Sequence, residues 1–150
     1  MHNDEYFMKK ALSEAAKAVD TDEVPVGAVI VKGDRIIARS FNFREKTNDP
    51  TAHAEIRAIR KACKKFASWR LDGCRIYVTI EPCSMCSGTI LWTRMDSIIY
   101  GAKDTKGGAC GSSYNLFEQK GMNHLVSIRS GVLEEDCKAI IRQYFKRKRK

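Results

Sequence analysis

Two short stretches of this sequence carry residues whose types and spacing suit metal chemistry, His53-Ala54-Glu55 and Pro82-Cys83-Ser84-Met85-Cys86. Cys83 and Cys86 are spaced i, i+3, so on a helix both thiols lie on one face and can bind one ion. The proline directly before them favours a helix start there. The partial positive charge at a helix N-terminus lowers a thiol pKa, and zinc binds thiolates. We therefore predict a site for a soft divalent metal, formed by these two thiols and the imidazole of His53.

The predicted ligand set is one short of a closed tetrahedron. A structural zinc site usually has four protein ligands, whereas a catalytic site leaves the fourth position to water, whose pKa falls to about 7. Glu55 stands two residues after His53, roughly 200° around an ideal helix, so helical geometry alone does not point both side chains at the metal. We expect Glu55 to reach that water and to act as general acid and base. The alternative is a structural zinc site with four ligands, completed by Cys74 or Cys110.

These two stretches resemble the zinc-dependent nucleoside and nucleobase deaminases, which carry H-A-E followed by P-C-x-x-C. Residues 24–131 resemble the bacterial tRNA-specific adenosine deaminases more narrowly, and this resemblance covers nearly the whole chain. It depends on four stretches: Val24-Pro25-Val26-Gly27-Ala28, Asp49-Pro50-Thr51-Ala52-His53-Ala54-Glu55-Ile56, Tyr77-Val78-Thr79-Ile80-Glu81-Pro82-Cys83 and Gly121-Met122-Asn123-His124. The metal motif alone indicates the superfamily, and the flanking stretches indicate the family.

Periodicity in the rest of the chain predicts an α/β fold. Strand-like segments at 24–32 and Arg35–Phe41 read as a hairpin, and the strands at Cys74–Ile80, 96–101 and 126–130 alternate with helices. The first helix is expected to run from Asp4, as N-cap, to about Val19, with Glu14 turned mostly to solvent. Two further helices are expected from 53 to about 66 and from 83 to about 94. A last helix is expected from 133 onwards, with a buried stripe of Cys137, Ile140, Ile141, Tyr144 and Phe145. The resemblance implies a three-layer α/β/α, cytidine deaminase-like fold around a mixed five-stranded sheet.

Length and composition agree with one compact domain over residues 1–150. At 150 residues and 43% hydrophobic content, the chain is large enough to bury a core and close a pocket. No apolar run is long enough to span a membrane, and the N-terminus lacks the pattern of a signal peptide, so we expect a cytoplasmic protein. Of the six cysteines, two are assigned to the metal and the rest are scattered; Cys63 and Cys137, which fall within helical patterns, are expected to be reduced and buried.

The resemblance also implies a set of residues around the substrate. Asn42 would hydrogen-bond the nucleoside, Val26 would line the pocket of the base, and Ala54 and Cys83 would contribute backbone amides. Asp104 would lie near the sugar and Lys106 near a phosphate. From the residues alone, Asn42 could equally be a turn-forming asparagine, and the glycine-rich segment 102–113 could be an ordinary surface loop.

The C-terminal helix end is strongly basic. Residues 142–150 contain six basic residues and no acid; the formal net charge of the chain is +9 and would be +3 without them. A basic helical end with aromatic neighbours, which here includes Arg149, is typical of nucleic-acid binding, although such a run is often only a solvated tail. Beside a deaminase motif, RNA is the favoured partner.

The resemblance therefore implies hydrolytic deamination of adenosine to inosine at the wobble position of an arginine tRNA anticodon, by a zinc-dependent homodimer. Leu91 and Trp92 stand where the family tends to carry smaller or polar residues. A deaminase of free guanine, cytosine or cytidine would share every metal ligand but would not need the basic tail. A zinc-stabilised RNA-binding module without catalysis would not need Glu55.

Overall fold

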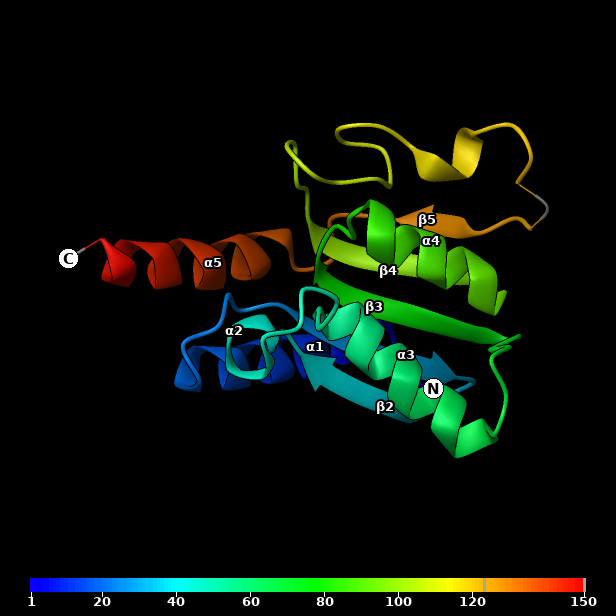
Figure 1. The fold of residues 1–150 in the computed structure, drawn as a ribbon, viewed down its shortest axis with the longest axis horizontal. Coiled ribbons are helices and arrows are strands. Elements are labelled where there is room, and N and C mark those ends of the chain that lie inside the picture. The colour runs from blue at the N-terminus through cyan, green and yellow to red at the C-terminus, as the bar shows by residue number, and fades with distance from the viewer. Residues whose placement is uncertain (123, 150) are drawn as a thin grey trace.

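The five strands of the chain form one mixed sheet in the order β2-β1-β3-β4-β5, with helices on both faces (Figure 1). The computed structural model describes residues 1–122 and 124–149. Asn123 of the fourth family stretch and Lys150 of the basic tail lie outside the described residues. The elements are α1 (Asp4–Asp20), β1 (Gly27–Lys32), β2 (Arg35–Phe41), α2 (Arg44–Thr47), α3 (Ala54–Phe66), β3 (Cys74–Ile80), α4 (Ser84–Thr93), β4 (Ser97–Ala102), a 3-10 turn (Leu116–Glu118), β5 (Ser127–Arg129) and α5 (Glu134–Lys148).

The sheet confirms the predicted fold class. Strand β1 pairs antiparallel with β2 and with β3, whereas β3, β4 and β5 pair in parallel. Residues 27–31 of β1 are all buried, which agrees with a strand covered on both faces. None of the helices in residues 1–122 and 124–149 is long and apolar enough to cross a membrane.

Two apolar clusters separate the layers. On one face, α3 and α4 pack on the sheet through residues such as Ala58, Ile90 and Ile76. On the other face, Phe7 of α1 and Cys137 of α5 pack against the opposite side of the same strands. The three layers therefore follow from the alternation of side chains along the strands, since successive residues enter different clusters.

The structure corrects three details of the predicted helices: one N-cap residue and the burial of side chains on α1 and α5. Asn3, rather than Asp4, caps α1 by accepting a hydrogen bond from the amide of Tyr6 at 2.9 Å. Glu14 is 2% exposed and pairs with Lys17, so it is not turned to solvent. Of the stripe predicted for α5, Cys137 and Tyr144 are buried, Ile140 and Ile141 are half-buried, and Phe145 is exposed.

One edge of the sheet collects the segments that carry the motifs. The end of β2 lies opposite the start of β1, because Phe41 pairs with Gly27. The ends of β3 and β4 lie side by side, because Ile80 pairs with Ala102. The loops that follow these strand ends carry the two motifs and the glycine-rich segment. Ligand sites of α/β folds form at such edges.

Candidate active site

The imidazole of His53 and the thiols of Cys83 and Cys86 meet between the N-termini of α3 and α4. The Nδ1 atom of His53 lies 3.7 Å from Sγ of Cys83 and 3.4 Å from Sγ of Cys86. All three ligand atoms lie within 4.8 Å of one another. His53 and Cys83 are the N-cap residues of their helices, so α4 begins one residue later than its proline suggests. His53 and Cys83 therefore reach the site from the residues at which α3 and α4 begin.

This cluster has the donors and the spacing that a zinc ion requires. In a tetrahedral site, Zn–S bonds of about 2.3 Å and Zn–N bonds of about 2.0–2.1 Å place the nitrogen and sulfur ligands about 3.5 Å apart. The separations from Nδ1 of His53 to the two thiols, 3.7 and 3.4 Å, agree with that spacing. The contacts from Cys86 and His53 lower the pKa of the Cys83 thiol to about 4, which favours the thiolate. The hydrogen bond to Cys83 raises the pKa of His53.

The candidate fourth ligands of a structural site do not join this cluster. Among the described residues, the group that could hold a metal at this point consists of His53, Cys83 and Cys86. Cys110 instead lies 3.5 Å from the hydroxyl of Ser87. Cys74 is buried at the start of β3, at the other end of that strand from the motif. All six cysteines are free thiols. The three-ligand arrangement is therefore the one that the geometry supports.

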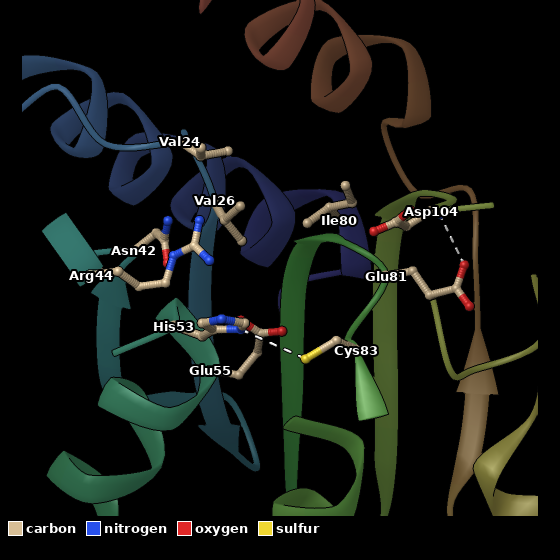
Figure 2. A pocket seen from close by; sticks show the side chains of 10 residues that line it. All are labelled: Val24, Val26, Asn42, Arg44, His53, Glu55, Ile80, Glu81, Cys83 and Asp104. Carbon is tan, nitrogen blue, oxygen red and sulfur yellow. Dashed lines mark hydrogen bonds between the residues drawn. The ribbon is translucent and has the colours of Figure 1, made fainter. Parts of the chain in front are cut away.

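The carboxyl group of Glu55 is buried beside the cluster. Glu55 is 3% exposed, and Figure 2 shows its side chain next to the imidazole of His53. Because His53 is an N-cap residue with extended backbone (φ −71°, ψ 154°), the angle expected for two helical residues does not apply. Desolvation raises the pKa of Glu55 to about 7. A carboxyl group in that range can both accept and donate a proton near neutral pH.

A pocket of about 190 Å³ opens onto this group. It is lined by Val24, Val26, Asn42, Arg44, His53, Glu55, Ile80, Glu81, Cys83 and Asp104, which come from the segment before β1, the loop after β2, α2, the start of α3, the end of β3 with the residues after it, and the loop after β4 (Figure 2). The sequence prediction named six of these residues as site residues. Ala54 is fully buried in the first turn of α3, next to them.

Two predicted substrate contacts lie away from the pocket wall. Lys106 is exposed in the loop after β4, and Arg149 is exposed at the end of α5. Asp104 is in the wall, and its Oδ1 accepts hydrogen bonds from the amides of Lys106 and Gly107 at 3.1 and 3.0 Å. The two basic residues can therefore contact only parts of a substrate that extend beyond the pocket.

Sequence reasoning did not assign a site role to Val24, Arg44, Ile80 or Glu81, which also line the pocket. Arg44 is the first residue of the short helix α2. For Glu81 the signal was its place directly before Pro82 and the first thiol ligand.

The model of the MafB19-like deaminase family matches residues 2–149 of the chain. The tRNA-specific adenosine deaminase of Bacillus subtilis is 45% identical over 150 residues, which span 100% of this chain and 93% of that protein. The enzyme of the same name from Agrobacterium fabrum is 46% identical over 96% of this chain and 95% of its own length. The fold and the site define a deaminase of the cytidine deaminase-like superfamily. Within it, the chain belongs to the tRNA-specific adenosine deaminase family.

Solved structures support the same placement. A structure from work on A-to-I editing by tRNA:A34 deaminases at the wobble position superposes with a TM-score of 0.87 and 46% identity, and covers 90% of this chain and 98% of that one. The guanine deaminase of Bacillus subtilis superposes with a TM-score of 0.67 and 38% identity, over 84% of this chain and 83% of its own. Guanine must therefore be included when substrates are compared.

Proposed function

We propose that this chain is a zinc-dependent hydrolase that converts adenosine to inosine at the wobble position of a tRNA anticodon, which by family resemblance is that of an arginine tRNA. The observation that carries the proposal is the placement of a buried carboxyl group, Glu55, beside the three-ligand cluster at the bottom of a small pocket. Three ligands leave a position for water, which is typical of a catalytic rather than a structural site.

His53, Cys83 and Cys86 would hold the ion. When bound, zinc supplies the Lewis acidity that activates water for attack on carbon. Glu55 accepts a proton from the attacking water and passes protons to the purine ring and to the amine at C6. The C6–N bond then breaks, ammonia leaves, and the new C6–O bond gives inosine. Glu55 thus moves protons in both halves of the reaction, for which a pKa of about 7 is well matched.

The pocket suits a single base. Its volume of about 190 Å³ is below the roughly 300 Å³ at which pockets for drug-sized ligands begin. A base inside an RNA stem cannot enter such a pocket, whereas a base extruded from an anticodon loop can. Val26 and Ile80 supply apolar wall, and the side chain of Asn42, which is 5% exposed, can hydrogen-bond the nucleoside.

The described part of the basic helix end, residues 142–149, supports RNA binding around the pocket. A second cavity, of about 370 Å³, is lined by Lys46 of α2 and by Tyr144 and Lys148 of α5. The first residue of α2, Arg44, lines the active pocket itself. Asp22 and Glu45 line the second cavity as well, and Lys148 pairs with Asp22, so the basic groups between α5 and α2 alternate with acidic ones. We assign the phosphates of the anticodon stem-loop to the exposed basic residues Lys46 and Arg149, and to Lys106 in the loop after β4.

We further propose that the enzyme is a cytoplasmic homodimer of single-domain subunits. Trp92 on α4 is 71% exposed, and with Leu91 and Met122 it lines a cavity of about 240 Å³ on the molecular surface. Large apolar side chains at one place on a surface favour a protein partner, and a second copy of this chain is the partner that the family implies. The tRNA substrate gives the reason for the cytoplasmic location.

The test is a substrate comparison with the zinc-loaded full chain. An arginine-tRNA anticodon stem-loop with adenosine at the wobble position is assayed for inosine and ammonia beside free adenosine, guanine, cytosine and cytidine. We expect conversion of the RNA alone. Ammonia released only from a free base or nucleoside would reject the RNA function, and release from guanine would assign the chain to the chemistry of its guanine deaminase neighbour.

A further inference from the structure

A second buried carboxylate flanks the first thiol ligand on the side opposite Glu55. Glu81 follows β3 directly, is 2% exposed and stands two residues before Cys83. Neither the metal cluster nor the proposed proton transfers use it. A buried carboxylate is costly unless its oxygens accept hydrogen bonds, so the partners of Glu81 indicate its role.

Those partners are three backbone amides of the glycine-rich loop. Oε1 of Glu81 accepts from the amide of Asp104 at 3.1 Å, the bond drawn in Figure 2. Oε2 accepts from the amides of Cys110 and Ser112, at 2.9 and 3.1 Å. Both ends of the loop that follows β4 are thus tied to one side chain. Hydrogen bonds to a charged acceptor are stronger than neutral ones, and here they replace the pairing that a sheet would give this segment.

The loop is also shaped to lie against this carboxylate. A Cβ atom placed on Gly108 would lie 2.4 Å from Cδ of Glu81 and 2.5 Å from the carbonyl oxygen of Asp104. Any side chain at Gly108 would therefore push the loop off Glu81. The neighbouring Gly107 has no such restriction, because its nearest atom, Oδ2 of Asp104, would be 3.4 Å away.

Asp104 is the link from this loop to the substrate. It lines the active pocket, and its Oδ1 is oriented by the amides of Lys106 and Gly107. Because Glu81 fixes the backbone of Asp104, and the turn fixes its side chain, the position of that carboxylate at the pocket depends on Glu81. With three N–H donors on its two oxygens, Glu81 is committed to the loop and is poorly placed to exchange protons with a substrate.

We propose that Glu81 is a positioning residue for the substrate: it holds loop 103–113, and with it Asp104, against the pocket. The proposal deepens the proposed function and rests on it for its kinetic consequence. Its structural half, the order of the loop, can be measured without any substrate.

The test uses Glu81→Gln in the zinc-loaded full chain. The variant keeps the shape of the side chain but turns an NH2 group toward backbone N–H donors, so at least one hydrogen bond is lost. We expect the amides of Asp104, Cys110 and Ser112 to exchange hydrogen at least about tenfold faster, with one zinc still bound per chain. With the anticodon stem-loop, we expect KM to rise about tenfold while kcat changes much less.

A double-mutant cycle tests whether Glu81 acts through Asp104. In a chain that already carries Asp104→Ala, the Glu81→Gln change should have little further effect on kcat/KM, because the group that it positions is gone. Gly108→Ala should reproduce the faster exchange and the raised KM without touching Glu81. Gly88→Ala, on α4 at a glycine where an added Cβ would meet nothing within 4 Å, is the control and should leave both unchanged.

Unchanged amide exchange in Glu81→Gln would overturn the proposal, whatever the substrate proves to be. Additive effects of Glu81→Gln and Asp104→Ala on kcat/KM would reject the route through Asp104. Loss of zinc in Glu81→Gln would show that the residue supports the ligand helix instead. If Glu81→Gln does not fold, Glu81→Asp and Gly108→Ala give the same readouts. An absence of RNA turnover in the unmodified chain rejects the proposed function but leaves the exchange result valid.

Discussion

The ammonium group of Lys148 donates two hydrogen bonds to the carboxylate of Asp22, at 3.1 and 2.9 Å, although the residues are 126 positions apart. Asp22 has left-handed backbone (φ 56°) in the turn after α1, and the hydroxyl of Tyr144 also donates to it, at 3.3 Å. One acidic side chain of the N-terminal half thus contacts two residues in the last turns of the basic helix α5.

This contact predicts a change in the titration of Asp22. The hydrogen bond from Lys148 is the largest cause that lowers the pKa of Asp22 below its ordinary value. Lys148→Ala should raise that pKa toward the ordinary value, as followed by NMR of the side-chain carboxyl carbon. Because the folded-state pKa is the lower one, the contact stabilises the helix end at neutral pH and is lost as the pH falls through the lowered pKa.

Lys146→Ala is the control for this titration, since Lys146 is exposed in the same helical turn and makes no described contact with Asp22. An equal pKa change in both variants would mean that only the general positive charge of the helix acts on Asp22. Both groups of the pair are exposed, so the free energy of unfolding should change little.

Glu55→Gln should abolish turnover with the metal retained. The amide keeps the shape of the side chain but cannot accept a proton from water or return it, and general acid–base catalysis contributes about 10² to 10⁴ in rate. Inosine formation and zinc content are measured on the same preparation. Glu118→Gln, at an exposed glutamate in the 3-10 turn, is the control and should behave as the unmodified chain. Full activity in Glu55→Gln would refute the proton-transfer role.

Removal of a metal ligand should lower both zinc content and activity. Cys86 is fully buried between Cys83 and Glu55, and a serine there offers a harder, weakly acidic donor that suits zinc poorly. We expect Cys86→Ser to lose most of its zinc, as measured by elemental analysis. Cys63→Ser, on α3 outside the cluster, should keep it. Equal loss of zinc in both variants would indicate general unfolding rather than loss of a ligand.

Much of this architecture could be predicted because local pattern and tertiary environment agree. The β-rich segment Cys74–Ile80 forms a strand with the predicted bounds, since its side chains enter both apolar clusters. Where two neighbouring residues have equal local propensity, the sequence could not decide. Asn3 and Asp4 both suit an N-cap, and Asn3 takes that place while the Asp4 carboxylate accepts hydrogen bonds from Arg129 and Tyr77.

The sequence did not reveal the role of Glu81 or the exposure of Phe145, because both depend on tertiary structure rather than on local pattern. Glu81 binds backbone amides 23 to 31 positions further along the chain, so no helical or strand-like sequence pattern links it to its partners. Such contacts depend on how the loop folds back, and residue type at the partner positions does not encode them. Phe145 fits the apolar stripe of α5 by spacing, but it is 42% exposed, because the last turns of α5 extend beyond the sheet (Figure 1).

Gly27→Ala should destabilise the fold. A Cβ atom on Gly27 would lie 1.9 Å from the carbonyl oxygen of Ala11 and 2.6 Å from the amide nitrogen of Ala15, so α1 would have to move away from β1. Overpacking of this kind costs about 1–3 kcal/mol or more. The free energy of unfolding is measured in urea, with Gly107→Ala as the control at a glycine that has room for a methyl group. A Gly27→Ala chain as stable as its parent would contradict the close packing of α1 on β1.

The basic end of α5 should account for much of the salt dependence of RNA binding. Arg147 and Arg149 are exposed, and neither lines the active pocket. For single-stranded nucleic acid, each phosphate contact adds about 0.7 to the slope of log affinity against log salt concentration. If each arginine contacts one phosphate, Arg147→Ala with Arg149→Ala should weaken stem-loop binding and reduce that slope by about 1.4 in total, while kcat at saturating RNA stays unchanged. Lys65→Ala, at the far end of α3 from the active pocket, is the matched charge control. An unchanged slope in the double arginine variant would show that this helix end is only a solvated tail, and would assign RNA binding to the loop residues nearer the pocket.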